Sequence, residues 1–440
     1  LLLLVPYGSM FFPIYIFIGG AFLFLSSIFL TQNKIKIEHA ILSVVVILMI
    51  YRYSFFSTYE FGIIFLTGIW LYVLFWVFRN KSHIDQSFIE YSLVFFGIWL
   101  LFALVQLMWV PISDNTIRHI QYLFSGVSVV IIMVLYVNSI DKIRVVYRAW
   151  KIGLSSMLIV GWWEVLTDNH LSKSGALFYG YKNIATGAYF NPNDFAFFLV
   201  ISIPLTFQML MERKIQQQIF GLLMLMNSIY FIYLSGARLI YIVLLFISLL
   251  FIVYLLLIKR ASLVFALFLT LFIGFIFYNE LFTDFYQQII TMNTNDKSTD
   301  IRGEVTQNAL SIIKGNILGV GPGNIESYIQ QSSVLLGFNT YGITNTHNWW
   351  IEILANYGIV IFILFLLFFI VTMKKIFSLL VENYEYHRYA LPIFISLLSF
   401  IPACVDPSSI FGIDITWFIL GFPLCIINVL VKKNIKGSNG

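Results

Sequence analysis

Long apolar stretches recur along the whole 440-residue chain, separated by short polar breaks. A helix that crosses the hydrocarbon core of a bilayer needs about 20 mostly apolar residues, and most of these stretches are close to that length. Only 11% of the residues are charged, against roughly 25% in soluble domains. The pattern excludes a soluble globular protein, and the continuous runs do not fit the short alternating strands of a membrane β-barrel. The sequence therefore predicts an all-α polytopic membrane protein.

We expect about 12–13 transmembrane helices, the count depending on whether the second and third apolar stretches are separate spans. The predicted segments are residues 11–30, 40–57, 61–78, 88–110, 120–138, 152–166, 194–211, 217–234, 239–258, 261–279, 349–372, 389–405 and 411–431. Residues 1–9 resemble a cloning linker with a protease site, so we expect the natural sequence to start at Met10.

The Lys and Arg residues indicate the orientation. Most of the 26 fall in every second polar break, and the positive-inside rule assigns those breaks to the cytoplasm. On this assignment the C-terminus is cytoplasmic. Residues 10–279 form a transmembrane helix bundle, residues 280–348 form a large external loop with catalytic elements, and residues 349–440 form the C-terminal transmembrane helices. The charges form no basic run, so nucleic acid is not an expected partner.

Ionisable groups at mid-bilayer usually mark ion or proton pathways. Here Glu164, Asp194, Glu352 and Asp414 all fall within about two turns of a predicted segment end. This placement argues against a proton-coupled transporter. A flippase or exporter for a lipid-linked sugar remains the alternative to an enzyme.

The external loop contains two predicted helices and a glycine-rich stretch between them. Glu304–Lys314 has the spacing of a short amphipathic helix, Gly315–Asn324 (GNILGVGPGN) cannot be helical, and Ile325–Leu336 can form a second helix. Backbone amides around Gly321 and Gly323 could cradle phosphate oxygens. The stretch lacks the Lys-Ser/Thr ending of a nucleotide loop, which favours a simple turn.

His347 lies where this loop enters a predicted membrane helix. Asn345 or Thr346 is the expected helix cap. The partial positive charge of a helix N-terminus disfavours a charged imidazole, so His347 would remain neutral and able to accept a proton. The alternative is an interfacial histidine beside two belt tryptophans.

Other polar residues are also expected on the external side. Arg238 follows a Ser-Gly-Ala turn, and its planar guanidinium suits phosphate oxygens, although a snorkelling anchor would have the same sequence. Arg302 begins the loop helix, where a solvated surface charge is the alternative. Asn191, Asn193 and Asp194 belong to an NPND motif that could simply cap the seventh segment.

Four sequence features, in the order in which they occur along the chain, resemble the O-antigen ligase and polymerase superfamily. They are the arginine after the Ser-Gly turn, the arginine that starts the main loop, GVGPGN, and HN before an apolar helix that contains NYGIV. The resemblance covers roughly residues 180–372. The NPND motif most resembles the branch that includes teichuronic-acid and capsule polymerases.

The resemblance implies a membrane glycosyltransferase in the bacterial cytoplasmic membrane, with its active site on the external side. Its donor would be a glycan on undecaprenyl diphosphate and its acceptor a sugar hydroxyl, without a cofactor. His347 would be the general base, and Arg238 and Arg302 would bind the diphosphate. Supporting roles would fall to Asn348, Asn191, Asn193, Asp194, Gly321 and Gly323. Whether a chain-length regulator binds is left open.

The residues also bear on the chemistry. Two fixed cations can stabilise a diphosphate leaving group, and the chain has no Asp-x-Asp pair, so we expect no metal. One base without an evident nucleophile favours single displacement with inversion. A polymerase that extends lipid-linked chains is the favoured activity. The alternative is a ligase that transfers the finished glycan to another anchor.

Overall fold

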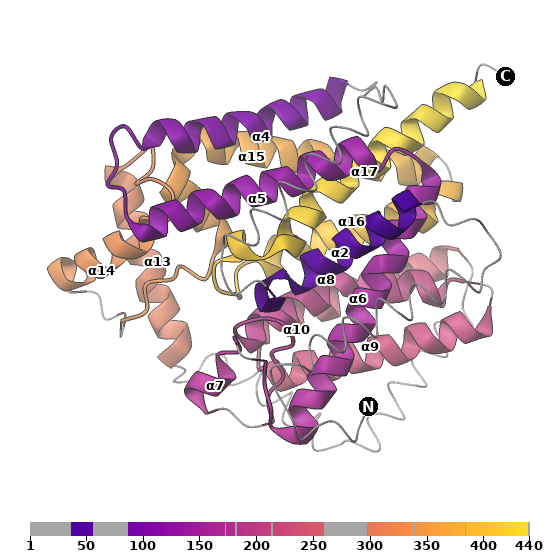
Figure 1. Ribbon diagram of the computed structural model, residues 1–440, viewed down its shortest axis with the longest axis horizontal. Coiled ribbons are helices and arrows are strands. Elements are labelled where there is room, and N and C mark those ends of the chain that lie inside the picture. The colour runs from indigo at the N-terminus through magenta and orange to yellow at the C-terminus, as the bar shows by residue number, and fades with distance from the viewer. Residues whose placement is uncertain are drawn as a thin grey trace.

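The computed structural model describes most of the chain (Figure 1). The described residues are 37–55, 87–171, 173–180, 183–212, 214–258, 297–337, 340, 342–382 and 384–438. The predicted segments 11–30, 61–78 and 261–279 and the linker-like residues 1–9 lie outside them.

Every regular element of the described residues is helical. The helices are α2 (Ile37–Phe55), α4 (Ser87–Gln106), α5 (Asp114–Tyr136), α6 (Ile140–Thr167), α7 (Ala176–Tyr179), α8 (Pro192–Leu210), α9 (Ile215–Ser235), α10 (Arg238–Leu257), α13 (Lys297–Gly315), α14 (Ile325–Leu336), α15 (Trp349–Glu382), α16 (His387–Ala403) and α17 (Asp414–Ser438), with short 3₁₀ turns η3 (Tyr384–Tyr386) and η4 (Ile410–Gly412). Seven of these helices are long and apolar enough to cross a membrane. The predicted all-α polytopic membrane fold is confirmed.

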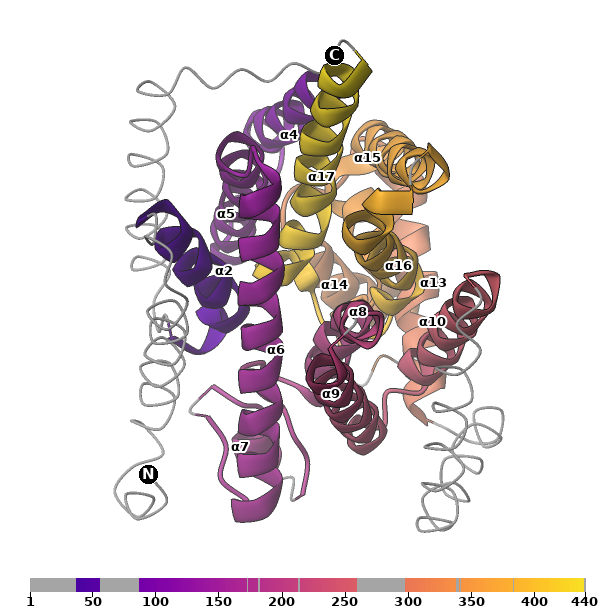
Figure 2. The same cartoon turned by 90° about the vertical axis from the view of Figure 1, so that its right-hand side faces the viewer.

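The helices differ in how much of their surface they bury. α8 and α17 are almost wholly buried, which fits helices that are apolar on all sides. α8 packs against α9 and α16, and α17 packs against α5. In Figure 2, α8 and α16 lie in the middle, between α6 and α10. α4, α9 and α10 keep large apolar side chains exposed, as expected for lipid-facing helices.

α6 begins earlier than the predicted segment 152–166. Its N-cap is Ser139, whose hydroxyl accepts a hydrogen bond from the Lys142 amide. The positive-inside rule assigned a polar break with Lys142, Arg144, Arg148 and Lys151 to the cytoplasm, and these residues lie within the first turns of α6. The apolar stretch in the sequence did not reveal this start, because charged residues are compatible with a helix end that leaves the apolar layer.

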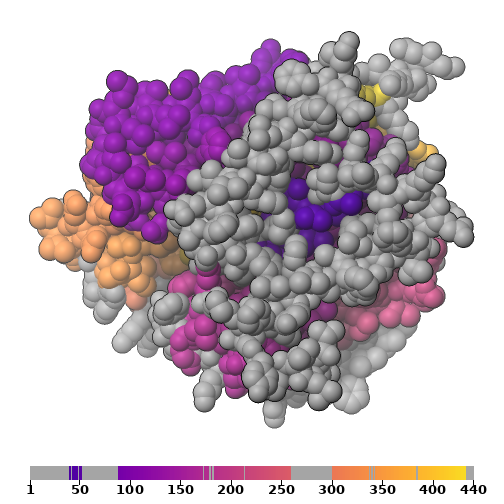
Figure 3. Space-filling view, viewed as in Figure 1, coloured from indigo at the N-terminus to yellow at the C-terminus, as the bar shows by residue number. Residues whose placement is uncertain are grey.

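α13 and α14 are the helices of the predicted external loop within the described residues. α13 extends the predicted amphipathic helix towards the N-terminus, and α14 has the predicted bounds. In Figure 3 these two helices, in orange, project beside the surface formed by α4 and α5, in purple.

α15 covers the predicted membrane segment 349–372 and extends beyond it, but it is not a straight helix. Gly358 has φ 77° and ψ 179°, so the helix is broken there. The break frees backbone groups, which residues 316–324, here called the glycine loop, satisfy. The amides of Val320 and Gly321 donate to the carbonyls of Ala355 and Asn356 at 2.8 and 3.0 Å. Such pairing is what allows irregular backbone at the depth of a membrane helix.

The glycines of this loop permit close backbone packing. Gly321 has φ 96°, and a Cβ there would lie 2.6 Å from the Val110 side chain. Gly323 has φ 71°, and its Cβ would lie 2.6 Å from the Asn115 carbonyl oxygen. Because the Gly321 amide is bonded to α15, it is not free to cradle a phosphate, and the simple-turn interpretation fits better.

Candidate functional site

Four consecutive residues between α16 and α17, Asp406 to Ser409, organise the candidate site. We call them the DPSS segment. The chain turns here, after α16 ends at Ala403 and before η4 begins at Ile410. The contacts are Arg302 with Asp406, His347 with the Pro407 carbonyl, Asp194 with Ser408, and Glu352 with Ser409. One short segment thus joins residues from three helices, α8, α13 and α15, and from the loop that leads into α15.

Arg302 is held by a buried carboxylate. Its Nη1 lies 2.6 Å from Oδ1 of Asp406, whose side chain is 4% exposed, whereas the Arg302 side chain is 34% exposed. The ion pair therefore orients the guanidinium and leaves part of it accessible. This geometry does not fit the alternative of a freely solvated surface charge.

His347 has a defined orientation. Its backbone has φ 47°, and its amide donates to Oδ1 of Asn345 at 2.8 Å. Its Nδ1 lies 3.1 Å from the Pro407 carbonyl oxygen. Because a carbonyl only accepts, Nδ1 carries the proton in the neutral ring, and Nε2 keeps the lone pair that a base needs.

The electrostatic surroundings keep His347 neutral. Burial lowers the pKa of its imidazole, and the Arg302 charge lowers it further. Hydrogen bonds to the backbone of Pro407 and Asp406, and the Asp406 charge, act in the opposite direction. A lowered pKa for His347 was expected from the sequence, and the direction agrees. The main causes are burial and the Arg302 charge rather than a helix N-terminus.

The predicted cap of α15 was wrong. Asn348, not Asn345 or Thr346, is the cap, since its Oδ1 accepts from the amides of Trp350 and Ile351 at 3.1 and 3.3 Å. Asn345 instead forms the turn that positions His347. α15 begins at Trp349, as the predicted segment 349–372 did, and the left-handed backbone of His347 keeps the helix from starting at the predicted caps.

The NPND motif begins α8. Asn191 caps the helix by accepting the Asp194 amide at 2.8 Å, as expected, and Asn193 is half-buried in the first turn. Asp194 has a further role that the sequence did not show. Its carboxylate is buried and accepts the Ser408 amide at 3.0 Å and the Ser408 hydroxyl at 2.9 Å.

Arg238 lies at the N-terminus of α10, directly after the left-handed Gly236 that ends α9. A cation at this end of a helix opposes the helix dipole, so an anion nearby would stabilise it. Tyr241, one turn further on, interacts electrostatically with both Arg238 and Asp406. α10 also packs against α16, which leads into the DPSS segment. Through α16, the helix that Arg238 begins is therefore a neighbour of the DPSS segment.

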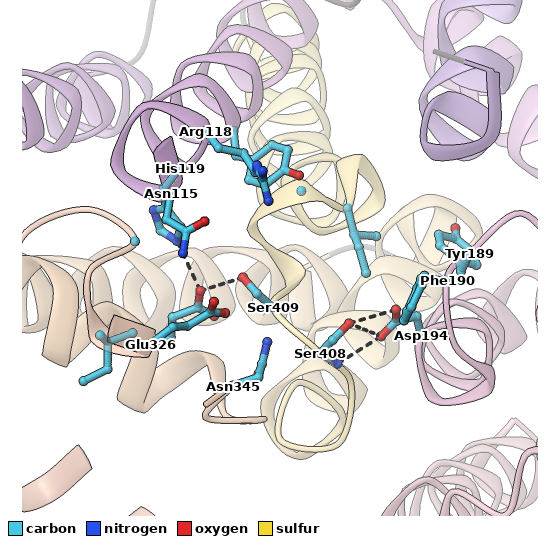
Figure 4. A pocket seen from close by; sticks show the side chains of 16 residues that line it. Asn115, Arg118, His119, Tyr189, Phe190, Asp194, Glu326, Asn345, Ser408 and Ser409 are labelled. Atoms are coloured by element: carbon cyan, nitrogen blue, oxygen red, sulfur yellow. Dashed lines mark hydrogen bonds and ion pairs between the residues drawn. The ribbon is translucent and has the colours of Figure 1, made fainter. Parts of the chain in front are cut away.

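A polar cluster that the sequence analysis did not single out lies beside the DPSS segment (Figure 4). Nε2 of His119 lies 3.1 Å from Glu352, and its Nδ1 lies 2.9 Å from the Tyr357 hydroxyl. Ser409 donates to the same Glu352 oxygen at 2.5 Å. His119 was overlooked because it lies near the end of an apolar segment. The only signal in the sequence was that a histidine and a glutamate each lie near the end of a predicted membrane helix.

Within the described ranges, no three His, Cys, Asp or Glu side chains are grouped as ligands for a metal ion. The absence of a metal from the reaction stays a prediction. Both oxygens of Asp194 accept from Ser408, Oε1 of Glu352 contacts His119 and Ser409, and Oδ1 of Asp406 pairs with Arg302. The buried Oδ2 of Asp406 has no hydrogen-bond partner among the described residues.

Comparison with known proteins gives two matches. A family model described as O-Antigen ligase matches residues 222–407. This range begins in α9, ends at Pro407, and includes Arg238, Arg302 and His347. The chain is also similar to the teichuronic acid biosynthesis protein TuaE of Bacillus subtilis (strain 168), with 25% identity over 401 residues, or 86% of this chain and 80% of that protein. Together these matches confirm the resemblance to the O-antigen ligase and polymerase superfamily that the sequence motifs predicted.

Proposed function

We propose that this membrane protein synthesises surface polysaccharide by transferring a glycan from undecaprenyl diphosphate to an acceptor sugar hydroxyl, on the outer face of the cytoplasmic membrane. The observation that carries the proposal is the convergence of Arg302 and His347 on adjacent residues of the DPSS segment, with Arg238 at the start of a neighbouring helix. A base and two guanidinium groups are the parts that such a transfer needs. The O-Antigen ligase match covers all three residues.

The reaction is a single displacement. Nε2 of His347 takes the proton of the acceptor hydroxyl, and the oxygen attacks the anomeric carbon of the donor. The bond from that carbon to the diphosphate oxygen breaks, and the diphosphate leaves with the electron pair. Arg238 and Arg302 stabilise its developing charge, which a metal ion would otherwise do. The buried carboxylates of Asp194 and Asp406 are held by hydrogen bonds or an ion pair, so inversion without a covalent intermediate is the expected outcome.

Polymerisation of repeat units is the favoured activity, because the NPND motif resembles the polymerase branch and TuaE is described as a biosynthesis protein. The alternative is a ligase that transfers the finished glycan to a different anchor, and the description of the matched family favours it. Both activities use the same residues.

Lipid-linked glycans in a deletion strain test the proposal. Single repeat units that accumulate on the external side support a polymerase, and long lipid-linked chains support a ligase. Units that remain on the cytoplasmic side would mean that the protein is a flippase. Normal polysaccharide and no accumulated intermediate would contradict all three activities.

Diphosphate binding is tested by replacing Arg238 with Lys. The variant keeps the charge but loses the planar fork, so we expect an activity loss of about tenfold or more at a normal membrane level. Arg148→Lys, an exposed position on α6, is the matched control and should remain active. Wild-type activity in both Arg238→Lys and Arg302→Ala would mean that neither arginine binds the donor.

A further inference from the structure

A cavity of about 220 Å³ adjoins the DPSS segment and has no part in the chemistry proposed above. Ser408 and Ser409 line it, whereas the preceding two residues contact Arg302 and His347. Asn345 also lines it and accepts the His347 amide, so the cavity lies next to the candidate base. The side chains come from α5, the starts of α8 and α14, and α15 (Figure 4).

The charge of the cavity disfavours an anion. Asp194, Glu326 and Glu352 contribute three carboxylates, against the cation Arg118 and His119, which is already paired with Glu352. A diphosphate or a uronate would meet net negative charge here. Carboxylates are, however, strong acceptors for the hydroxyl groups of a neutral sugar.

Glu326 is available to such a ligand. Burial and the neighbouring Glu352 raise the pKa of its carboxyl group, and His119 and Arg118 partly oppose this shift. Among the residues that the structure describes, no side chain donates a hydrogen bond to Glu326, unlike Asp194 and Glu352. Both oxygens of Glu326 can therefore still accept a donor from a ligand.

Tyr189 provides an independent indication of a ligand. It lines the cavity and is 3% exposed. Its buried hydroxyl has no hydrogen-bond partner within the described part of the chain. Buried polar groups are nearly always paired, so an unpaired hydroxyl on a residue that lines the cavity is unusual. Tyr122 and Phe190 add aromatic rings to a wall that otherwise consists largely of polar and charged side chains.

From these features we propose that the cavity binds the terminal sugar of the acceptor and that this sugar is uncharged, a neutral hexose or an N-acetylhexosamine. The inference rests on the proposed function. Pockets for drug-sized ligands measure about 300–1,000 Å³, so this smaller cavity suits one sugar ring and not a whole repeat unit. A ring bound here places a hydroxyl towards His347, while the donor diphosphate stays with the arginines.

Titration calorimetry on the full chain in lipid nanodiscs, without donor, tests this. The probes are the methyl glycosides of glucose, N-acetylglucosamine and glucuronic acid. We expect a neutral glycoside to bind and the glucuronide to bind at least about tenfold more weakly. Glu326→Gln should weaken neutral binding about tenfold and reduce the discrimination against glucuronide. Tyr189→Phe, which removes only the hydroxyl, should cause a smaller loss.

Gln331→Ala is the control, since Gln331 is exposed on the same helix as Glu326 and does not line the cavity. It should bind like wild type. The proposal is overturned if no neutral glycoside binds, if the glucuronide binds equally well, or if Glu326→Gln and Tyr189→Phe both bind like wild type. Because no donor is present, these results are independent of transfer. A deletion strain that accumulates repeat units, together with absent glycoside binding, would reject the sugar site and leave the proposed function standing.

Discussion

The glycine loop and the DPSS segment are both irregular, and both lie against broken or ending helices, but they contribute different atoms. The glycine loop acts through its backbone, whose amides complete α15 at the Gly358 break. The DPSS segment acts through three side chains, the Pro407 carbonyl and the Ser408 amide, which hold Arg302, His347, Asp194 and Glu352. The glycine loop, which is the more conspicuous of the two in the sequence, therefore has a structural role. The DPSS segment, which is less conspicuous, organises the candidate site.

The largest expected effect tests the DPSS side of this comparison. His347→Ala should reduce the rate of transfer by about 10²- to 10⁴-fold, because a positioned base typically contributes that much. His347→Gln should be similarly slow, since an amide cannot take a proton. Single-turnover transfer with lipid-linked repeat units measures the rate, and separately measured donor binding should be unchanged. If both variants react like wild type, the base must be sought among external carboxylates such as Asp194 and Glu326.

The next effect concerns the glycine loop and appears in stability. Gly323→Ala places a Cβ 2.6 Å from the Asn115 carbonyl at φ 71°, so we expect a loss of about 2–4 kcal/mol in unfolding free energy. Thermal unfolding in detergent measures it. Gly303→Ala, on α13 with open space around the new Cβ, is the control and should gain up to about 1 kcal/mol. Lost activity at unchanged stability in Gly323→Ala would instead favour the phosphate-cradle interpretation of the loop.

A smaller effect is expected from Ser408. Ser408→Ala removes the hydroxyl that donates to Asp194 but keeps the hydrogen bond from the backbone N–H of residue 408 to the same carboxylate. One lost hydrogen bond to a buried charge corresponds to about a tenfold loss of activity. Steady-state transfer measures it, with Ser378→Ala on α15 as the control, since that hydroxyl bonds only to its own helix. Equal activity of the two variants would show that the DPSS hydroxyls do not support the site.

The smallest effect is a shift in pH dependence. The Arg302 charge lowers the pKa of His347, so Arg302→Gln should raise that pKa. Because the base must be neutral, the acid limb of kcat/KM should move to higher pH in this variant. The residual activity of Arg302→Gln over a range of pH measures the shift. An acid limb at the wild-type position would mean that His347 is not the titrating base.

Part of the site could be predicted from the sequence. His347, Arg238 and Arg302 were chosen from residue chemistry and motif order, and the structure brings His347 and Arg302 to one segment. The cap of α15 could not be assigned, because Asn345 and Asn348 have the same chemistry and only backbone geometry separates them. His119 and Glu352 could not be paired, because 233 positions separate them in the sequence.

The sequence by itself determined the class of this protein. Apolar stretches long enough to cross a bilayer permit only helices, because backbone groups in lipid must pair within their own segment. The tertiary structure alone decided where α15 breaks and which residues surround the site. Both depend on backbone and side-chain pairs that are distant in sequence, such as Gly321 with Asn356 and Ser409 with Glu352. Apolar pattern and local propensity act over a few turns of one helix, so they contain no information on which distant segments meet.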